Sequence, residues 1–140
     1  AQLIHGSDYF KNANNKILKF AMIETKEAVN NLDEILSVKN LTGVYIGPAD
    51  MSSSYGLQPQ FDIKEDPIFS NIKLIANKAK EYGKISGIHT GSTSYAKEMI
   101  GLGFNLVTIS SDFRSMTTFA QNIINEMKEK NINESKSDTY

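Results

Sequence analysis

Short apolar runs alternate along the chain with longer segments whose apolar residues recur at helical spacing. The short runs fall at residues 17–23, 43–46, 85–89 and 105–109, and each is followed by one such segment. Apolar runs of this length, bounded by turn residues, are typical of buried strands. A connection that holds a helix makes consecutive strands parallel. The pattern therefore predicts an α/β chain of four βα units built on one parallel sheet.

Start signals and apolar stripes place the helices between these runs. The sequence predicts helices over residues 7–14, 25–38, 66–82, 93–101 and 112–127. Asp66 followed by Pro67 is the clearest start signal, an N-cap with proline at the first helical position. Residues 1–6 are predicted to be a loop. Asp50 is expected to open a second, longer loop that is rich in serine and glycine.

The predicted helices carry apolar stripes, which indicate packing against the sheet. Ile100 is expected to face inward on the helix that contains it. The last helix is expected to start with Asp112 as its cap and to bury one continuous stripe. That stripe consists of Met116, Phe119, Ala120, Ile123, Ile124 and Met127.

A carboxylate follows each of the first two predicted strands. Glu24 ends the first strand, and Asp50 follows the second after Gly47-Pro48-Ala49. The carboxyl ends of parallel strands share one edge, where α/β proteins bind ligands, so the two side chains should lie together. Two oxygen ligands suit Mg²⁺ or Mn²⁺ if they lie within about 8 Å of each other. The alternative is that Glu24 caps the next helix and Asp50 orders a turn.

The same residues carry a family resemblance. The segment I-E-T-K-E-A-V-x-N-L-D-E-I from Ile23, followed by G-V-Y-I-G-P-A-D-M-S from Gly43, resembles the HpcH/HpaI aldolases. These are metal-dependent class II pyruvate aldolases, similar to 2,4-dihydroxyhept-2-ene-1,7-dioic acid aldolase. The likeness extends from Asp8 to Asp112. It implies a (β/α)₈ TIM barrel of the pyruvate/phosphoenolpyruvate superfamily, of which this chain carries the C-terminal half.

The resemblance also implies roles for individual residues. Glu24 and Asp50 would be the protein's ligands to a divalent cation, Mg²⁺ or Mn²⁺ or, as a further option, Co²⁺. The backbone N–H groups of Ala49 and Asp50 would hold the carboxylate of pyruvate, and Ser52 would lie beside the metal. The implied lyase reaction joins a metal-stabilised pyruvate enolate to an aldehyde, or cleaves a 4-hydroxy-2-oxo acid in reverse.

Two histidines differ in their expected positions. His89 ends the third strand at the ligand edge, where the family usually has an apolar residue that faces the substrate. It is expected either to contact the distal part of the substrate or to transfer a proton. The alternative is a structural histidine bonded to a neighbouring backbone carbonyl. His5 lies in a predicted loop and is expected to be a solvent-exposed bystander.

Composition narrows the class of protein. The 140 residues are 40% hydrophobic and 22% charged, with a net charge of −1, which predicts one globular domain over residues 1–127. Residues 128–140 are polar and are expected to form a disordered tail. The lysines are dispersed, which argues against a nucleic-acid surface. The chain has no cysteine, which excludes a thiolate metal site and fits a cytoplasmic protein. None of its apolar runs is long enough to predict a membrane span.

The chain is shorter than the barrel that the resemblance implies. A (β/α)₈ barrel needs about 250 residues, so we expect a fragment that is inactive alone, with the base and an arginine supplied by the N-terminal half. No catalytic residue is therefore assigned within this chain. Half a barrel leaves strand edges and apolar faces open, which predicts closure by that other half or by a homo-oligomer.

Two alternatives to the aldolase hypothesis remain at this point. One is a non-catalytic, flavodoxin-like α/β module that binds a metal or another ligand and is complete at this length. The other is a citrate-lyase-like enzyme that cleaves an ester of coenzyme A. The sequence leaves open the aldehyde substrate, the preferred ion and the oligomeric state.

Overall fold

A four-stranded sheet forms the centre of the fold. The computed structural model describes residues 2–137, and side chains within residues 3–128. The strands are β1 (Phe20–Ile23), β2 (Gly43–Ile46), β3 (Ile85–Thr90) and β4 (Leu106–Ile109), and they lie in the order β1-β2-β3-β4. The four predicted strands are thus confirmed, although the first begins at Phe20 rather than at residue 17.

The strand pairing is parallel and in chain order. Ile23 of β1 lies opposite Ile46 of β2, and Ile46 lies opposite Ile88 of β3. Strand ends therefore line up at one edge, so that the residues after Ile23 and Ile46 become neighbours. This is the arrangement that a series of right-handed βα units produces in a barrel.

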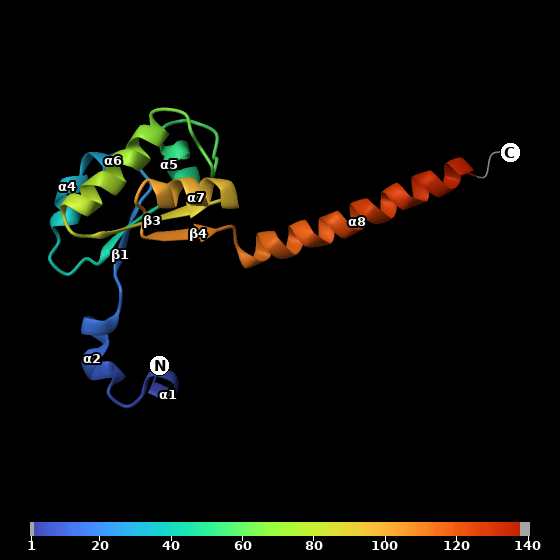
Figure 1. The fold of residues 1–140 in the computed structure, drawn as a ribbon. Helices are drawn as coiled ribbons and strands as arrows, with labels where there is room; N and C mark the ends of the chain where they lie inside the picture. Colours follow the sequence, from blue (N-terminus) through green and yellow to red (C-terminus); the bar gives the residue numbers. More distant parts are fainter. Residues whose placement is uncertain (1, 138–140) are drawn as a thin grey trace. The chain divides into compact units, whose positions relative to one another are not determined.

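Helices follow the strands and cover one face of the sheet, where Figure 1 shows α4, α6 and α7. The helices are α1 (Gln2–His5), α2 (Tyr9–Lys16), α3 (Lys26–Asn30), α4 (Leu32–Ser37), α5 (Pro48–Ser54), α6 (Ile68–Glu81), α7 (Thr93–Gly101) and α8 (Asp112–Ser137). The chain divides into two compact units, residues 1–108 and residues 109–140. None of the helices within residues 2–137 combines the length and the apolar character that a membrane span requires.

Several predicted helix boundaries are wrong. The helix expected over residues 25–38 is interrupted at Asn31, whose ψ of 16° leaves the helical range, so α3 and α4 are separate helices. Residues 2–5, predicted to be loop, form α1. Helix α6 begins one residue later than expected, after Pro67, and the Asp66 carboxylate accepts the backbone N–H of Ser70 at 3.1 Å.

The predicted buried stripes of the last two helices also need correction. Ile100 is 60% exposed. The apolar residues of α8 are exposed as well, Phe119 at 69% and Met116 at 66%. Helix α8 continues through Ser137, across most of the segment predicted to be a disordered tail, and residues 138–140 lie outside the described residues. The division into a domain over residues 1–127 and a tail stays a prediction.

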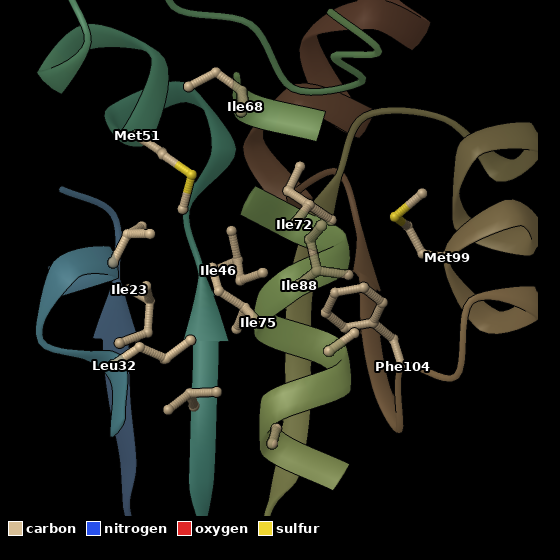
Figure 2. Close-up of a cluster of buried hydrophobic side chains, with 14 of the residues drawn as sticks. Ile23, Leu32, Ile46, Met51, Ile68, Ile72, Ile75, Ile88, Met99 and Phe104 are labelled. Carbon is tan, nitrogen blue, oxygen red and sulfur yellow. The ribbon is translucent and has the colours of Figure 1, made fainter. Parts of the chain in front are cut away.

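The helix-covered face of the sheet holds the apolar core. Ile23, Ile46 and Ile88 point to this face and are fully buried. Figure 2 shows them facing Ile72 and Ile75 of α6. Burying such a side chain contributes about 1.5–3 kcal/mol, so this layer fixes the positions of the strand ends.

The opposite face of the sheet is only partly covered. Because side chains alternate along a strand, Met22 and Tyr45 point away from the core. Met22 is 49% exposed, and Leu106 on β4 is 38% exposed. In a complete barrel this face would be the interior, so the residues on it are candidates for ligand contact.

Close packing between β2 and β3 yields a prediction. A Cβ on Gly43 would lie 2.1 Å from the carbonyl oxygen of Ile85, so Gly43→Ala should force the strands apart and lower the free energy of unfolding by about 1–3 kcal/mol or more. Gly101→Ala is the matched control, because a Cβ there meets no heavy atom within 4 Å. Urea denaturation monitored by circular dichroism measures both. Equal stability of Gly43→Ala and the unsubstituted protein would contradict the packing described.

Candidate metal and substrate site

The two predicted metal ligands lie on either side of Gly47. A Cβ placed on Gly47 would be 2.8 Å from Oε2 of Glu24 and 3.6 Å from Oδ2 of Asp50. The sum of these two distances is the upper limit for the separation of the two oxygens, and it is inside the limit of about 8 Å for carboxylates bridged by an ion or by its bound water. The φ of Gly47 is −100°, which any residue adopts. A Cβ here would displace the Glu24 carboxylate, so glycine leaves the space that this carboxylate occupies.

Neither carboxylate has the structural role that the alternative interpretation gave it. Thr25 caps α3, and its hydroxyl accepts the N–H of Ala28 at 3.0 Å, so Glu24 is not the cap. Asp50 lies in the first turn of α5, not at the start of a loop as predicted. Within the part of the chain that the structure describes, Glu24 and Asp50 form no hydrogen bond or ion pair through their carboxylates. Both side chains are thus available to a ligand.

The donor set fits a hard divalent cation. No group of three or more His, Asp and Glu side chains among the described residues could hold a metal ion. Two carboxylates supply oxygen ligands of the type that Mg²⁺ and Mn²⁺ prefer, and they leave further coordination positions for water or a chelating ligand. The residues present fit such an ion. Their role as its ligands remains a prediction.

The first turn of α5 offers two backbone donors next to these carboxylates. The first intrahelical bond of α5 runs from the N–H of Met51 to the carbonyl of Gly47 at 2.9 Å. The N–H groups of Ala49 and Asp50 precede it, and a helix leaves such groups without intrahelical acceptors. Both residues line a pocket at this edge. They are placed where a carboxylate of a ligand could accept their hydrogen bonds.

Ser52 is not brought to this pocket. Its side chain is fully buried, and its hydroxyl donates to the carbonyl of Pro48 at 2.8 Å within α5. Ser52 is absent from the described residues that line the pocket. The geometry therefore gives Ser52 a role inside the helix and does not support the predicted position beside the metal.

Asp50 and His89 line the same pocket. It has a volume of about 200 Å³ and is lined by Met22, Tyr45, Gly47, Pro48, Ala49, Asp50, Phe61 and His89. Nδ1 of His89 lies 2.9 Å from the hydroxyl of Thr108, which also bonds to the hydroxyl of Tyr45. His89 is thus bonded to a side chain, not to a backbone carbonyl as its structural alternative required.

Sequence reasoning missed Tyr45, Phe61 and Thr108. For Tyr45 and Thr108 a signal existed, because both lie on strands at positions that alternate away from the core. Phe61 had none, since it reaches the pocket through the long loop between α5 and α6. Its ring meets that of His89 edge-on, with 5.2 Å between the centroids.

The loop that carries Phe61 is held at two points. The Asp62 carboxylate accepts the backbone N–H of Gly91 at 2.7 Å. The buried Tyr95 hydroxyl donates to the carbonyl of Ile63 at 2.6 Å. Burial raises the pKa of Tyr95 above its usual range, and the charge of Asp62 adds to this, so the donor stays protonated. The loop forms one fixed wall of the pocket.

The other predicted residues lie outside the pocket lining. His5 is exposed on α1 and stacks on Tyr9 with 5.1 Å between ring centroids. The Asp112 carboxylate accepts the N–H of its neighbour Phe113, and the hydroxyl of Ser111 accepts the N–H of Arg114. Ser111, rather than Asp112, therefore caps α8.

With the geometry in place, comparison with known proteins identifies the family. The family model described as HpcH/HpaI aldolase/citrate lyase matches residues 4–118. This chain belongs to that family. The resemblance inferred from the Ile23 and Gly43 segments is confirmed.

The relatives are aldolases of about twice the length. The chain is 38% identical over 122 residues to a hydroxypyruvate/pyruvate aldolase of Rhizorhabdus wittichii, covering 87% of this chain and 49% of that protein. It is 36% identical over 107 residues to a 4-hydroxy-2-oxo-heptane-1,7-dioate aldolase of Escherichia coli, covering 75% and 39%. The chain therefore spans half or less of the curated relatives that it matches.

A solved structure agrees on the fold. The HpcH/HpaI aldolase from Desulfitobacterium hafniense superposes with a TM-score of 0.78 at 22% sequence identity, covering 88% of this chain and 47% of that one. The four βα units of this chain thus correspond to about half of a TIM barrel in this family. The predicted fold class is confirmed.

The site geometry predicts a divalent cation site that depends on both carboxylates. Glu24→Gln and Asp50→Asn should each weaken Mn²⁺ binding by about tenfold or more, since even outer-shell changes at metal sites cost that much. Electron paramagnetic resonance titration of free Mn²⁺ measures the affinity. Among the described residues, neither carboxylate accepts a hydrogen bond that the variant would lose, so folding should persist. Glu27→Gln, an exposed acid in the first turn of α3, is the control and should bind normally. Unchanged affinity in both site variants would contradict the assignment.

Proposed function

We propose that this chain supplies the metal and pyruvate platform of a class II aldolase that forms or cleaves 4-hydroxy-2-oxo acids. One observation carries the proposal: the carboxylates of Glu24 and Asp50, which pair with no other described residue, flank Gly47 beside the first-turn N–H groups of α5. That combination offers both halves of a 2-oxo acid site. The two side-chain carboxylates would hold a cation that the oxygens of the 2-oxo acid also bind. The backbone N–H groups would donate hydrogen bonds to the carboxylate of the 2-oxo acid.

Each part of the pocket has a proposed task. The bound Mg²⁺ or Mn²⁺ would act as a Lewis acid that polarises the 2-oxo group. The N–H groups of Ala49 and Asp50 would orient the pyruvate carboxylate, and the part of the pocket that His89 lines would hold the aldehyde portion. The base that removes the methyl proton is not assigned to any residue of this chain.

The topology separates this proposal from the flavodoxin-like alternative. A flavodoxin-like sheet has the strand order 2-1-3-4-5, with helices on both faces. Here the order follows the chain, β1-β2-β3-β4, as it does in a barrel. The non-catalytic module of that fold is therefore not supported.

We also propose that the intact protein is a homo-oligomer. The support is the exposed apolar stripe on α8, in which Met116, Phe119 and Met127 are all more than half exposed. Apolar surface arranged along one helical face is typical of an interaction site.

Two assays on the intact gene product test the aldolase proposal. Exchange of the pyruvate methyl protons for deuterium, followed by NMR, should require added Mg²⁺ or Mn²⁺. Cleavage of a 4-hydroxy-2-oxo acid, followed by pyruvate release, should show the same requirement. Glu24→Gln and Asp50→Asn should lower both rates by about a hundredfold or more, as loss of electrostatic stabilisation does elsewhere.

A third substrate distinguishes the remaining alternative. A hydroxyacyl ester of coenzyme A should not be cleaved at a comparable rate. Rapid cleavage of that ester without methyl exchange would favour the citrate-lyase-like reaction. Absence of exchange and of both cleavage reactions, with Mn²⁺ bound, would overturn the enzymatic proposal.

A further inference from the structure

We propose that His89 determines specificity by presenting a fixed N–H donor at Nε2 to an oxygen acceptor on the aldehyde partner. The favoured aldehydes would carry a hydroxyl or a carboxylate in place of a plain alkyl group. The inference rests on the proposed aldolase function. It concerns His89, which lines the same pocket as Asp50 and is not one of the proposed metal ligands.

The hydroxyl groups around His89 set the position of its proton. Tyr45 and Thr108 share a hydrogen bond between their hydroxyls, and Nδ1 of His89 lies 2.9 Å from the same Thr108 oxygen. Within the described residues, Thr108 is the hydrogen-bond partner of the Tyr45 hydroxyl, and either oxygen can be the donor. In the arrangement that we infer, Tyr45 donates to Thr108, and the single proton of the Thr108 hydroxyl is donated to Nδ1.

An accepting Nδ1 fixes the tautomer of the ring. A neutral imidazole carries one proton, so when Nδ1 accepts, Nε2 holds that proton and is a donor. Within the described part of the chain, Nε2 forms no hydrogen bond to protein. His89 lines the pocket, so this donor is left for a ligand.

The ring is also held in place from the side. Phe61 meets His89 edge-on at an interplanar angle of 65°. The residue after Phe61 anchors the loop, because the Asp62 carboxylate accepts the Gly91 N–H. A donor whose orientation is fixed before binding discriminates better than a mobile one, because less freedom is lost when the ligand binds.

The rest of the pocket makes this donor selective. Apart from Asp50, the Tyr45 hydroxyl and backbone groups, its lining is apolar, from Met22, Pro48, Ala49 and Phe61. A ligand that ends in an alkyl group would leave the Nε2–H without an acceptor on the ligand. Sites built to hydrogen-bond a substrate oxygen reject analogues that lack it.

The tautomer is tested first, by ¹⁵N NMR of the intact gene product at a pH above the titration of imidazole. His89 should show the Nε2–H form, and Thr108→Val should mix the two neutral forms because Nδ1 loses its donor. Thr117→Val, which removes an exposed hydroxyl on α8, is the matched control. An Nδ1–H form in the unsubstituted protein would overturn the proposal.

Specificity is tested with pairs of aldehydes of similar size, each offered with pyruvate and Mn²⁺. Glycolaldehyde is compared with propanal for the hydroxyl, and succinic semialdehyde with pentanal for the carboxylate. The ratio of kcat/KM within a pair should favour the oxygenated aldehyde and should fall about tenfold in His89→Leu, more for the carboxylate. His89→Gln, which keeps an N–H donor, should recover part of it. His5→Leu, at the chain's other histidine, should keep the ratio.

The outcomes separate this inference from the proposed function. Deuterium exchange at pyruvate in the unsubstituted protein, with ratios that do not change in His89→Leu and His89→Gln, would overturn the role of His89 alone. No exchange in the unsubstituted protein would overturn the aldolase proposal and this inference with it. A ratio within one variant cancels any general loss of activity, so a merely structural role of His89 would not move it.

Discussion

The repulsion between two carboxylates held across a single glycine is the constraint on which the site depends. Glu24 and Asp50 both approach Gly47, and no cation of the described chain pairs with either. Two like charges no more than about 6 Å apart repel by roughly 0.7 kcal/mol or more in water-like surroundings. A divalent cation between them turns that repulsion into attraction. The arrangement is therefore unfavourable alone and favourable around an ion.

Strand register produces this closeness. Ile23 and Ile46 are paired across β1 and β2 and fully buried, so the residues that follow them, Glu24 and Gly47, emerge side by side. Asp50 then returns to the same point because α5 begins at once and its first turn carries the side chain back. The apolar core thus controls the site through the positions of the strand ends. Any residue larger than glycine at position 47 would meet the Glu24 carboxylate.

Much of this could be predicted from sequence, because the signals are local. The apolar runs give the strands, and parallel order gives the shared edge that holds Glu24 and Asp50. What could not be predicted depends on three-dimensional contacts. The helix expected over residues 25–38 breaks at Asn31, and α5 starts at Pro48, where a loop was expected. Ser52 was expected beside the metal, but its hydroxyl is bonded within α5. The Tyr45, Thr108 and His89 network joins three strands, and no short segment contains it.

The α8 stripe illustrates the same limit. Its spacing predicts an apolar face correctly, but a sequence pattern does not say whether that face is covered by its own chain or by another.

For the metal ion, in contrast, the carboxylates of Glu24 and Asp50 define where the ion should bind. Crystals grown with Mn²⁺ and measured at a wavelength with strong anomalous scattering by manganese test it most directly. We expect one strong peak within about 2.5 Å of a carboxylate oxygen of Glu24 and of a carboxylate oxygen of Asp50. Saturating Mn²⁺ with no peak between these two side chains would contradict it.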